Sequence, residues 1–151
     1  MVMYNKALFE AAGIDPEDPQ MASYDEFLAG SRAIVESGVQ SAIWPAPTSE
    51  FYQPWFDFYP LYLAETDGTM LVEDGAATVD SDAGREVAEF WKTFYDEKLS
   101  PNEASTDDAM SAGTTAMQLA GPWAIPSYAE TVDVGFMPVP TSDGRENPTT
   151  F

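Results

Sequence analysis

The spacing of apolar residues in the first part of the chain predicts two amphipathic helices. The first is expected over residues 6–12 and ends at Gly13, because glycine readily adopts the left-handed conformation that follows a helix. The second is expected from Ser23 to Gly38, since Ser23 and Glu26 have capping-box spacing. Its apolar side chains recur every three or four residues: Tyr24, Phe27, Leu28, Ile34 and Val35.

Further helices are predicted in the second half of the chain. The longest begins after Ser81, a residue type suited to a helix N-cap. A short one is expected to begin at Ser105 or Thr106 and to end near Gly113, and another follows the Gly121-Pro122 pair. The buried face of the longest helix has helical spacing: Val87, Phe90, Trp91, Phe94 and Tyr95.

Short extended segments separate these helices. Residues 41–44, 115–119 and 132–139 are predicted as strands, and residues 78–79 as a short extended piece. From Pro140 onward the chain is polar and turn-like, and we expect it to be loosely held. The alternation predicts an α/β fold in which helices pack on a small mixed sheet.

The length and residue types exclude several classes of protein. The chain has 151 residues, enough for one domain but too few for two lobes and a hinge. It contains no cysteine or histidine, which excludes disulfides, Cys/His zinc sites and Ser-His-Asp or Cys-His catalysis. Residues 80–84 begin like a calcium loop but lack its closing Glu. We expect no metal and no cofactor.

The chain is strongly acidic, which limits the environments and the binding partners that suit it. There are 26 acidic and 6 basic residues, for a net charge of −20, and the acids are spread along the chain. Dispersed acid with few lysines is typical of a solvated surface in high salt, where a Debye length of roughly 3 Å removes the repulsion. We therefore predict a halophilic protein, although a cation or basic partner would also suit this charge. Nucleic acid is disfavoured, because its phosphates require Lys and Arg.

Five segments of the chain carry recognisable motifs: residues 4–15, 23–28, 110–117, 121–124 (Gly-Pro-Trp-Ala) and 134–140. In this order they resemble motifs of the family 1 extracellular solute-binding proteins of ABC importers, most closely the maltose- and multiple-sugar-binding branches. Ser23 and Tyr24 stand where the family has Thr and Trp, and Met110 and Thr114 also depart from its pattern. The likeness runs nearly end to end.

The resemblance implies a type II periplasmic-binding-protein-like fold with two α/β lobes. Residues 1–151 would form a single domain within the second lobe, without the first lobe or the C-terminal helices. The implied function is to bind a carbohydrate between the lobes and deliver it to a membrane permease, with no catalysis. The parent would be extracellular, secreted or lipid-anchored, and we expect its signal to lie outside this chain, whose N-terminus lacks a charged-then-apolar pattern.

Aromatic residues are the candidates for sugar contact, because a flat ring covers the apolar face of a pyranose. Trp123 follows a Gly-Pro turn between a strand and a helix, and we expect it at the surface of the lobe, on the side that faces the missing partner lobe. The matching Trp of sugar-binding relatives often stacks on the ligand. The aromatic segment 51–62 should begin at the same edge of the sheet. Core packing is the alternative for each of these side chains, and it is preferred for Trp91. The ligand-binding candidates are Trp123, Trp55, Phe56, Tyr59 and Trp44.

Two other functions remain open. The solute could be an organic anion, a peptide or a polyamine, although the few basic residues disfavour an anion. A glycoside-acting enzyme would need two carboxylates, and Glu50 and Asp57 lie seven residues apart in the aromatic segment. Such a pair arises easily by chance among so many acids. Without its partner lobe the exposed cleft face could also draw two copies of the chain together.

Overall fold

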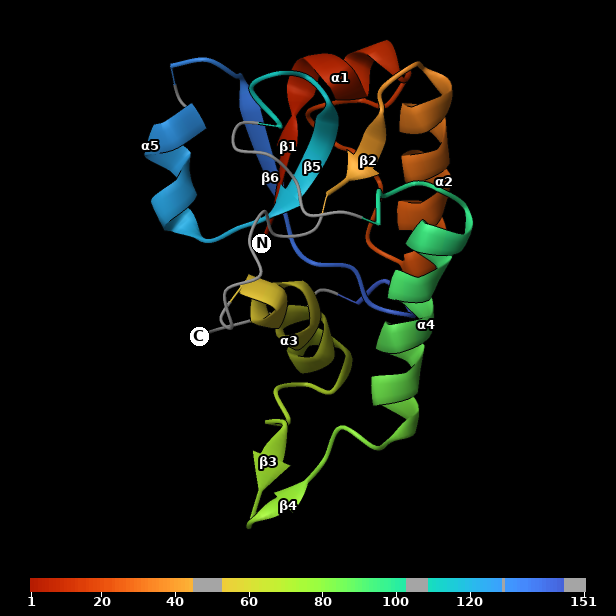
Figure 1. The fold of residues 1–151 in the computed structure, drawn as a ribbon, viewed down its shortest axis with the longest axis vertical. Coiled ribbons are helices and arrows are strands. Elements are labelled where there is room, and N and C mark those ends of the chain that lie inside the picture. The colour runs from red at the N-terminus through yellow and green to blue at the C-terminus, as the bar shows by residue number, and fades with distance from the viewer. Residues whose placement is uncertain (45–52, 103–108, 129, 146–151) are drawn as a thin grey trace.

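The computed structural model describes residues 1–44, 53–102, 109–128 and 130–145. Within these residues a four-stranded sheet has the order β2-β5-β1-β6 (Figure 1). Strands β2 and β5 run parallel, whereas β1 is antiparallel to both of its neighbours. The sheet is therefore mixed, as the sequence predicted. Its strands are β1 (Val2–Asn5), β2 (Ser41–Ile43), β5 (Thr115–Leu119) and β6 (Val134–Met137).

Strand β1, which lies inside the sheet, was not predicted. Val2, Met3 and Tyr4 are all buried, so the strand shows a short apolar run and no alternation. A short apolar run does not distinguish a buried strand from part of a helix, and here a helix follows the run directly. Asn5 ends the strand and also caps that helix, α1 (Lys6–Ala11), by accepting from two backbone N–H groups.

The caps of the first two helices agree with the sequence. Helix α1 ends in a Schellman motif, in which Ile14 N donates to the Phe9 carbonyl and Gly13 takes a positive φ of 77°. Helix α2 (Tyr24–Glu36) begins with the complete capping box of Ser23 and Glu26. The carboxylate of Glu26 accepts from Ser23, which lowers the pKa of Glu26. Both helix starts are thus encoded by local side chains.

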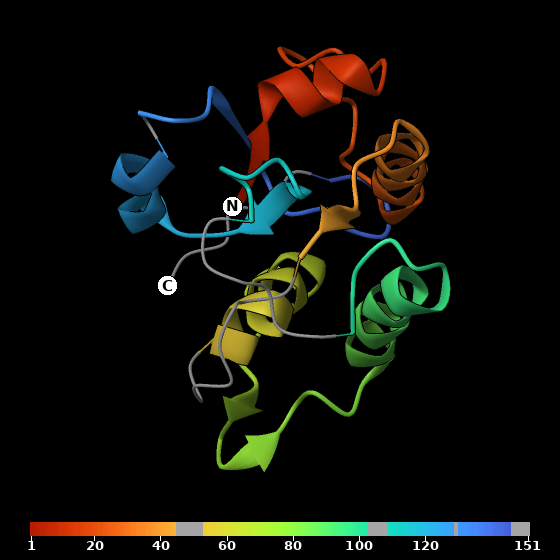
Figure 2. The same cartoon turned by 45° about the horizontal axis from the view of Figure 1, so that its top comes forward.

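Two further helices pack against each other beside the sheet. They are α3 (Gln53–Glu65) and α4 (Asp82–Asp96), the latter capped by Ser81 as predicted. Figures 1 and 2 show α3 beside α4, with the sheet between these helices and α1. The indole of Trp91 on α4 donates to the Asp57 carbonyl on α3 at 2.6 Å and packs against the core. The prediction that Trp91 is a packing residue is therefore confirmed.

A β-hairpin joins α3 to α4 and was missed. Its strands are β3 (Val72–Glu73) and β4 (Ala76–Ala77), so the predicted extended piece at residues 78–79 directly follows β4. Asp74 and Gly75 connect the strands with φ values of 50° and 79°. Both central residues of such a turn need a positive φ, which is why an Asp-Gly pair is a strong hairpin signal, and this pair was available in the sequence.

The remaining helical predictions have mixed outcomes. Residues 103–108, where the short helix was expected to begin, lie outside the described residues, and residues 109–113 form turns. After Pro122 the chain forms a single 3₁₀ turn, η1 (Pro122–Ala124), followed by helix α5 (Ile125–Tyr128). Proline at the start of that turn confirms the expected helix entry.

The expectation that the chain is loose from Pro140 is wrong for residues 140–145. Thr141 is fully buried and forms a parallel bridge with Ser23. Its neighbour Ser142 donates from both backbone N (2.8 Å) and Oγ (2.6 Å) to the buried carboxylate of Glu65. Arg145 Nη2 lies 3.8 Å from the same carboxylate. A polar sequence is ordered here because its partner is a buried acid on α3, which local sequence does not reveal.

Candidate functional site

Two tryptophans follow neighbouring parallel strands at one edge of the sheet. The register pairs Ser41 with Thr115 and Ile43 with Met117, so β2 and β5 end side by side. Trp44 comes directly after β2, and Trp123 lies just beyond β5 in η1. Ligands of open α/β sheets bind outside the carboxyl ends of the strands. The pairing thus brings two of the predicted positions to the expected edge.

Trp123 is a large apolar side chain that remains exposed. Its exposed fraction is 65%, which confirms the predicted surface position. A Cβ atom on Gly121 would lie only 2.0 Å from a carbon of the Trp123 ring, so the indole rests directly on Gly121. The φ of Gly121 is −96°, which any residue tolerates. Glycine is therefore needed here for the close approach of the ring and not for the backbone angle.

The turn that carries Trp123 is tied to the sheet on both sides. The Tyr128 hydroxyl on α5 hydrogen-bonds to Oε1 of Gln118 on β5, at 2.9 Å. On the strand side, Ala120 N donates to the Met1 carbonyl at 3.1 Å. These contacts hold Trp123 in place from before and after the turn. Gln118 and Tyr128 were not among the predicted site residues, and no motif marks them as a pair.

Helix α3 reaches the same edge through its apolar face. Ile43 and Leu119, the last residues of β2 and β5, line a small cavity of about 10 Å³ together with Leu61 of α3. Leu61 and Ile43 belong to one hydrophobic core cluster, and Leu119 packs against it, so α3 shares its core with both parallel strands. Residues 45–52, which connect β2 to α3, lie outside the described residues, so the expectation that two strand-to-helix connections converge stays a prediction.

The structure describes the side chains of some predicted aromatic residues and not of others. Trp55 and Phe56 lie on α3, but their side chains are outside the described part of the molecule. Tyr59 is partly buried, and Trp44 is buried with an exposed fraction of 7%. Trp44 therefore presents little surface to a ligand in this chain, whereas Trp123 presents most of its ring. Their roles as ligand contacts stay predictions.

Basic side chains are engaged by carboxylates across the described residues. Five of the six Lys and Arg residues form ion pairs, and the Arg32 guanidinium binds Glu97 through two nitrogens at 2.6 and 2.8 Å. An anionic ligand would have to compete with these carboxylates. The pairs are Lys6–Glu17, Arg32–Glu97, Arg85–Asp80, Lys92–Asp96 and Arg145–Asp143.

Metal-ligand clusters and membrane-spanning helices are both absent from residues 1–44, 53–102, 109–128 and 130–145. No cluster of three or more potential metal ligands occurs there. Among those same residues, no helix has the length and apolar character needed to cross a bilayer. Glu50, one half of the hypothetical catalytic pair, lies outside the described residues.

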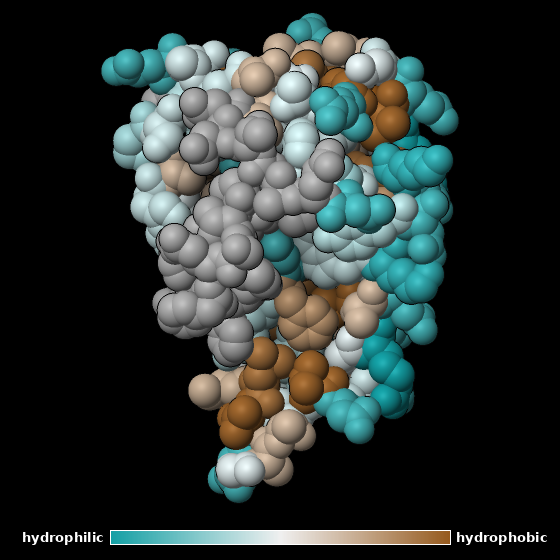
Figure 3. Space-filling model, in the orientation of Figure 1, coloured by the Kyte–Doolittle hydropathy of each residue, from teal (hydrophilic) through white to brown (hydrophobic). Residues whose placement is uncertain are grey.

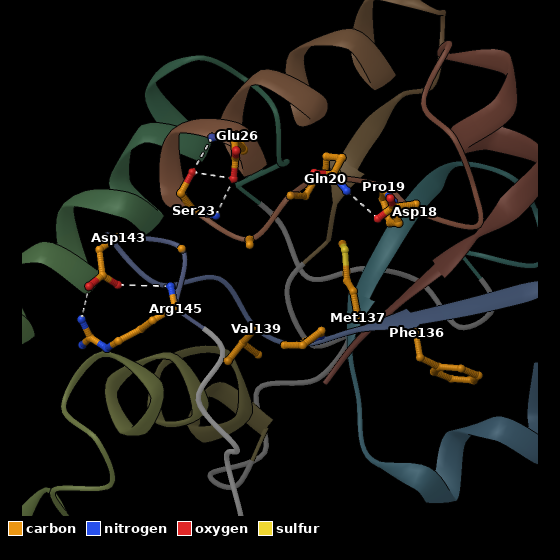
Figure 4. A pocket seen from close by; sticks show the side chains of 14 residues that line it. Asp18, Pro19, Gln20, Ser23, Glu26, Phe136, Met137, Val139, Asp143 and Arg145 are labelled. Carbon is orange, nitrogen blue, oxygen red and sulfur yellow. Dashed lines mark hydrogen bonds and ion pairs between the residues drawn. The ribbon is translucent and has the colours of Figure 1, made fainter.

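A separate groove of about 550 Å³ lies beside β6 and was not anticipated (Figure 4). Its polar side chains pair with one another: Gln20 donates to Asp18, Ser23 pairs with Glu26, and Arg145 donates to Asp143. Phe136 on β6 points away from these pairs. Because the polar groups in its wall already have partners, the groove is a weaker candidate than the edge at Trp123.

Comparison with known families defines the class of protein. The family model of bacterial extracellular solute-binding proteins matches residues 1–150. The chain belongs to this family, whose members serve ABC importers. A search of curated proteins finds no significant match.

Solved structures of binding proteins share the fold. The cyclic α-maltosyl-1,6-maltose binding protein of Arthrobacter globiformis has a TM-score of 0.77 and 24% identity, over 93% of this chain and 37% of that one. A Thermotoga lettingae solute-binding protein bound with α-D-tagatose has a TM-score of 0.70 and 24% identity, over 91% and 38%. UgpB of Mycobacterium tuberculosis, in complex with glycerophosphocholine, has a TM-score of 0.74 and 19% identity, over 93% and 36%. The chain thus spans little more than a third of each relative.

Proposed function

We propose that residues 1–151 form part of the second lobe of a carbohydrate-binding protein, and that the sugar is held between this lobe and a first lobe. The observation that carries the proposal is the indole of Trp123, 65% exposed and supported by Gly121 at the carboxyl end of β5. An exposed flat ring on a rigid turn suits the apolar face of a pyranose. The maltosyl- and tagatose-binding neighbours support a carbohydrate over other solutes.

Half of such a site would come from elsewhere in the parent protein. Neighbouring structures are almost three times as long as the aligned part, which covers 37% of them. Ligand exclusion from water and pairing of the hydroxyls would require both lobes. The parent closes on its solute by hinge motion, docks on a membrane permease outside the cell, and performs no chemistry on the ligand. Secretion or a lipid anchor would keep it there.

Titration of the full-length parent tests this function. Calorimetry with a panel of mono- and disaccharides should show binding to the wild type, and Trp123→Ala should weaken it about a hundredfold, at the cost of about 2–3 kcal/mol that a lost aromatic anchor carries. Trp123→Phe is the matched control and should retain most of the affinity. The 151-residue chain alone should bind much more weakly.

Three outcomes would overturn the proposal. Unchanged affinity in Trp123→Ala would remove the indole from the site. Tight binding by the isolated chain would contradict the half-site. Binding of glycerophosphocholine or a polyamine, with no sugar bound, would keep the family and change the solute.

A further inference from the structure

The β3–β4 hairpin presents an apolar face that no described residue covers. Val72 pairs with Ala77 across the hairpin, and the same register places Met70 opposite Val79. Residues opposite each other share a face of a sheet, so these four side chains lie together. Met70, Val72 and Val79 are exposed by 55%, 58% and 38%. Figure 3 shows apolar residues gathered at this end of the molecule.

The hairpin is held in place despite its small size. Thr78 N donates to the Leu71 carbonyl at 3.0 Å and extends the pairing beyond β3 and β4. The hydroxyl of Tyr62, a buried residue of α3, donates to the Thr78 carbonyl at 2.9 Å. Leu71 and Thr78, on the opposite face from Val72, are half-buried. The apolar face therefore points outward from an anchored scaffold, which limits the entropy lost when a partner binds.

The charges around this face narrow the choice of partner. Residues 66–80 contain four carboxylates and no Lys or Arg. The nearest basic residue along the chain, Arg85, is bound to Asp80 and Asp82. A second copy of the chain would bring another acidic rim, and an anionic lipid surface would be repelled in the same way. An apolar surface ringed by Lys and Arg complements both the apolar face of the hairpin and the carboxylates around it.

We propose that the hairpin face formed by Met70, Val72, Ala77 and Val79 is a docking surface for a basic, apolar-centred protein surface on the importer's membrane subunits. This inference rests on the proposed function. It adds a contact site that is separate from the edge at Trp123. Exposed apolar patches on soluble domains commonly mark such interaction sites.

Binding of the full-length protein to proteoliposomes that carry the importer tests the proposal, with empty liposomes as the blank. The double variant Met70→Gln/Val72→Thr removes apolar surface while Thr keeps the β-branch at residue 72, and it should weaken binding about tenfold. Ala76→Thr, exposed on the other face, is the matched control and should bind like wild type. Circular dichroism checks that each variant is folded.

A second variant tests the contribution of charge to docking separately from that of the apolar side chains. Asp74→Asn removes one carboxylate at a positive φ that asparagine tolerates. Its binding should be weaker than wild type at about 0.2 M KCl and equal to it at about 3 M, where charges are screened. The double variant should be weaker at both salt concentrations.

The outcomes distinguish this inference from the function on which it rests. Solute titration of the hairpin variants should give wild-type affinity. If the double variant binds the proteoliposomes as wild type does, the docking surface is wrong while the solute-binding function stands. If the double variant instead abolishes a dimer seen by analytical ultracentrifugation, the occupant is a second copy and the proposal fails. Failure of the wild type to bind either solute or importer would overturn both.

Discussion

At the scale of single residues, the arrangement at the sheet edge depends on one missing methyl group. Trp123 can lie on Gly121 only because no Cβ stands there, and the Tyr128–Gln118 hydrogen bond fixes the turn from the other side. The ring therefore lies on Gly121 while most of its surface is open to solvent. Gly121 acts on a ligand through Trp123 and is a positioning residue.

Gly121→Ala should displace the indole, because the new methyl carbon would stand 2.0 Å from the ring. We expect altered tryptophan fluorescence and about a tenfold loss of sugar affinity in the full-length protein. The double variant Gly121→Ala/Trp123→Ala should bind no more weakly than Trp123→Ala alone, since both changes act on one ring. Additive losses would show that Gly121 contributes independently of Trp123.

At the scale of elements, a buried acid connects α3 to the segment that follows β6. The carboxylate of Glu65 accepts from Ser142 and lies near Arg145, and burial together with the charge of Glu65 raises the pKa of the Tyr24 hydroxyl well above its ordinary value. Helix α3 also shares a hydrophobic core cluster with β2 through Leu61 and Ile43, and Leu119 of β5 packs against that cluster. The position of the aromatic helix is thus determined by contacts at both of these places.

Glu65→Ala should destabilise the domain by about 2 kcal/mol, because Ser142 N and the Arg145 guanidinium lose a buried partner. Glu65→Gln keeps one acceptor oxygen and should cost less. Denaturant unfolding measures both changes, and Glu36→Ala, at an exposed position of α2, is the control. Equal stability of Glu65→Ala and Glu36→Ala would contradict a role for this connection.

At the scale of the whole molecule, the excess of acidic over basic residues affects both stability and association. The net charge is −20, and five of only six basic residues already bind carboxylates. The remaining acids repel one another across the surface, which weakens a compact state at low ionic strength. The same charge should keep copies of the chain apart until salt screens it.

The thermal midpoint of the chain should therefore rise between about 0.1 and about 3 M KCl, as the Debye length shortens from roughly 10 Å to below about 3 Å. Sucrose, which favours compact states without screening charge, is the control. A midpoint that does not respond to KCl, or that responds equally to sucrose, would contradict adaptation to high salt.

The sequence by itself determined the features that short-range chemistry controls. The capping box of Ser23 and Glu26, the cap at Ser81 and the proline entry at Pro122 each involve residues within a few positions of one another. Ordered motifs also indicated the family, and the Gly-Pro turn indicated that Trp123 would be exposed. The Asp74-Gly75 hairpin was encoded equally locally and could have been predicted.

Only the tertiary structure decided the features that depend on distant partners. Strand β1 is recognisable because β5 and β6 pair with it on both sides, and its apolar run carries no period of its own. Residues 140–145 are ordered by Glu65, which lies some 77 positions away from Ser142. Trp44 became buried although it follows a strand at the ligand edge, as Trp123 does. Burial depends on which side chains surround a residue in space, and sequence spacing does not contain that information.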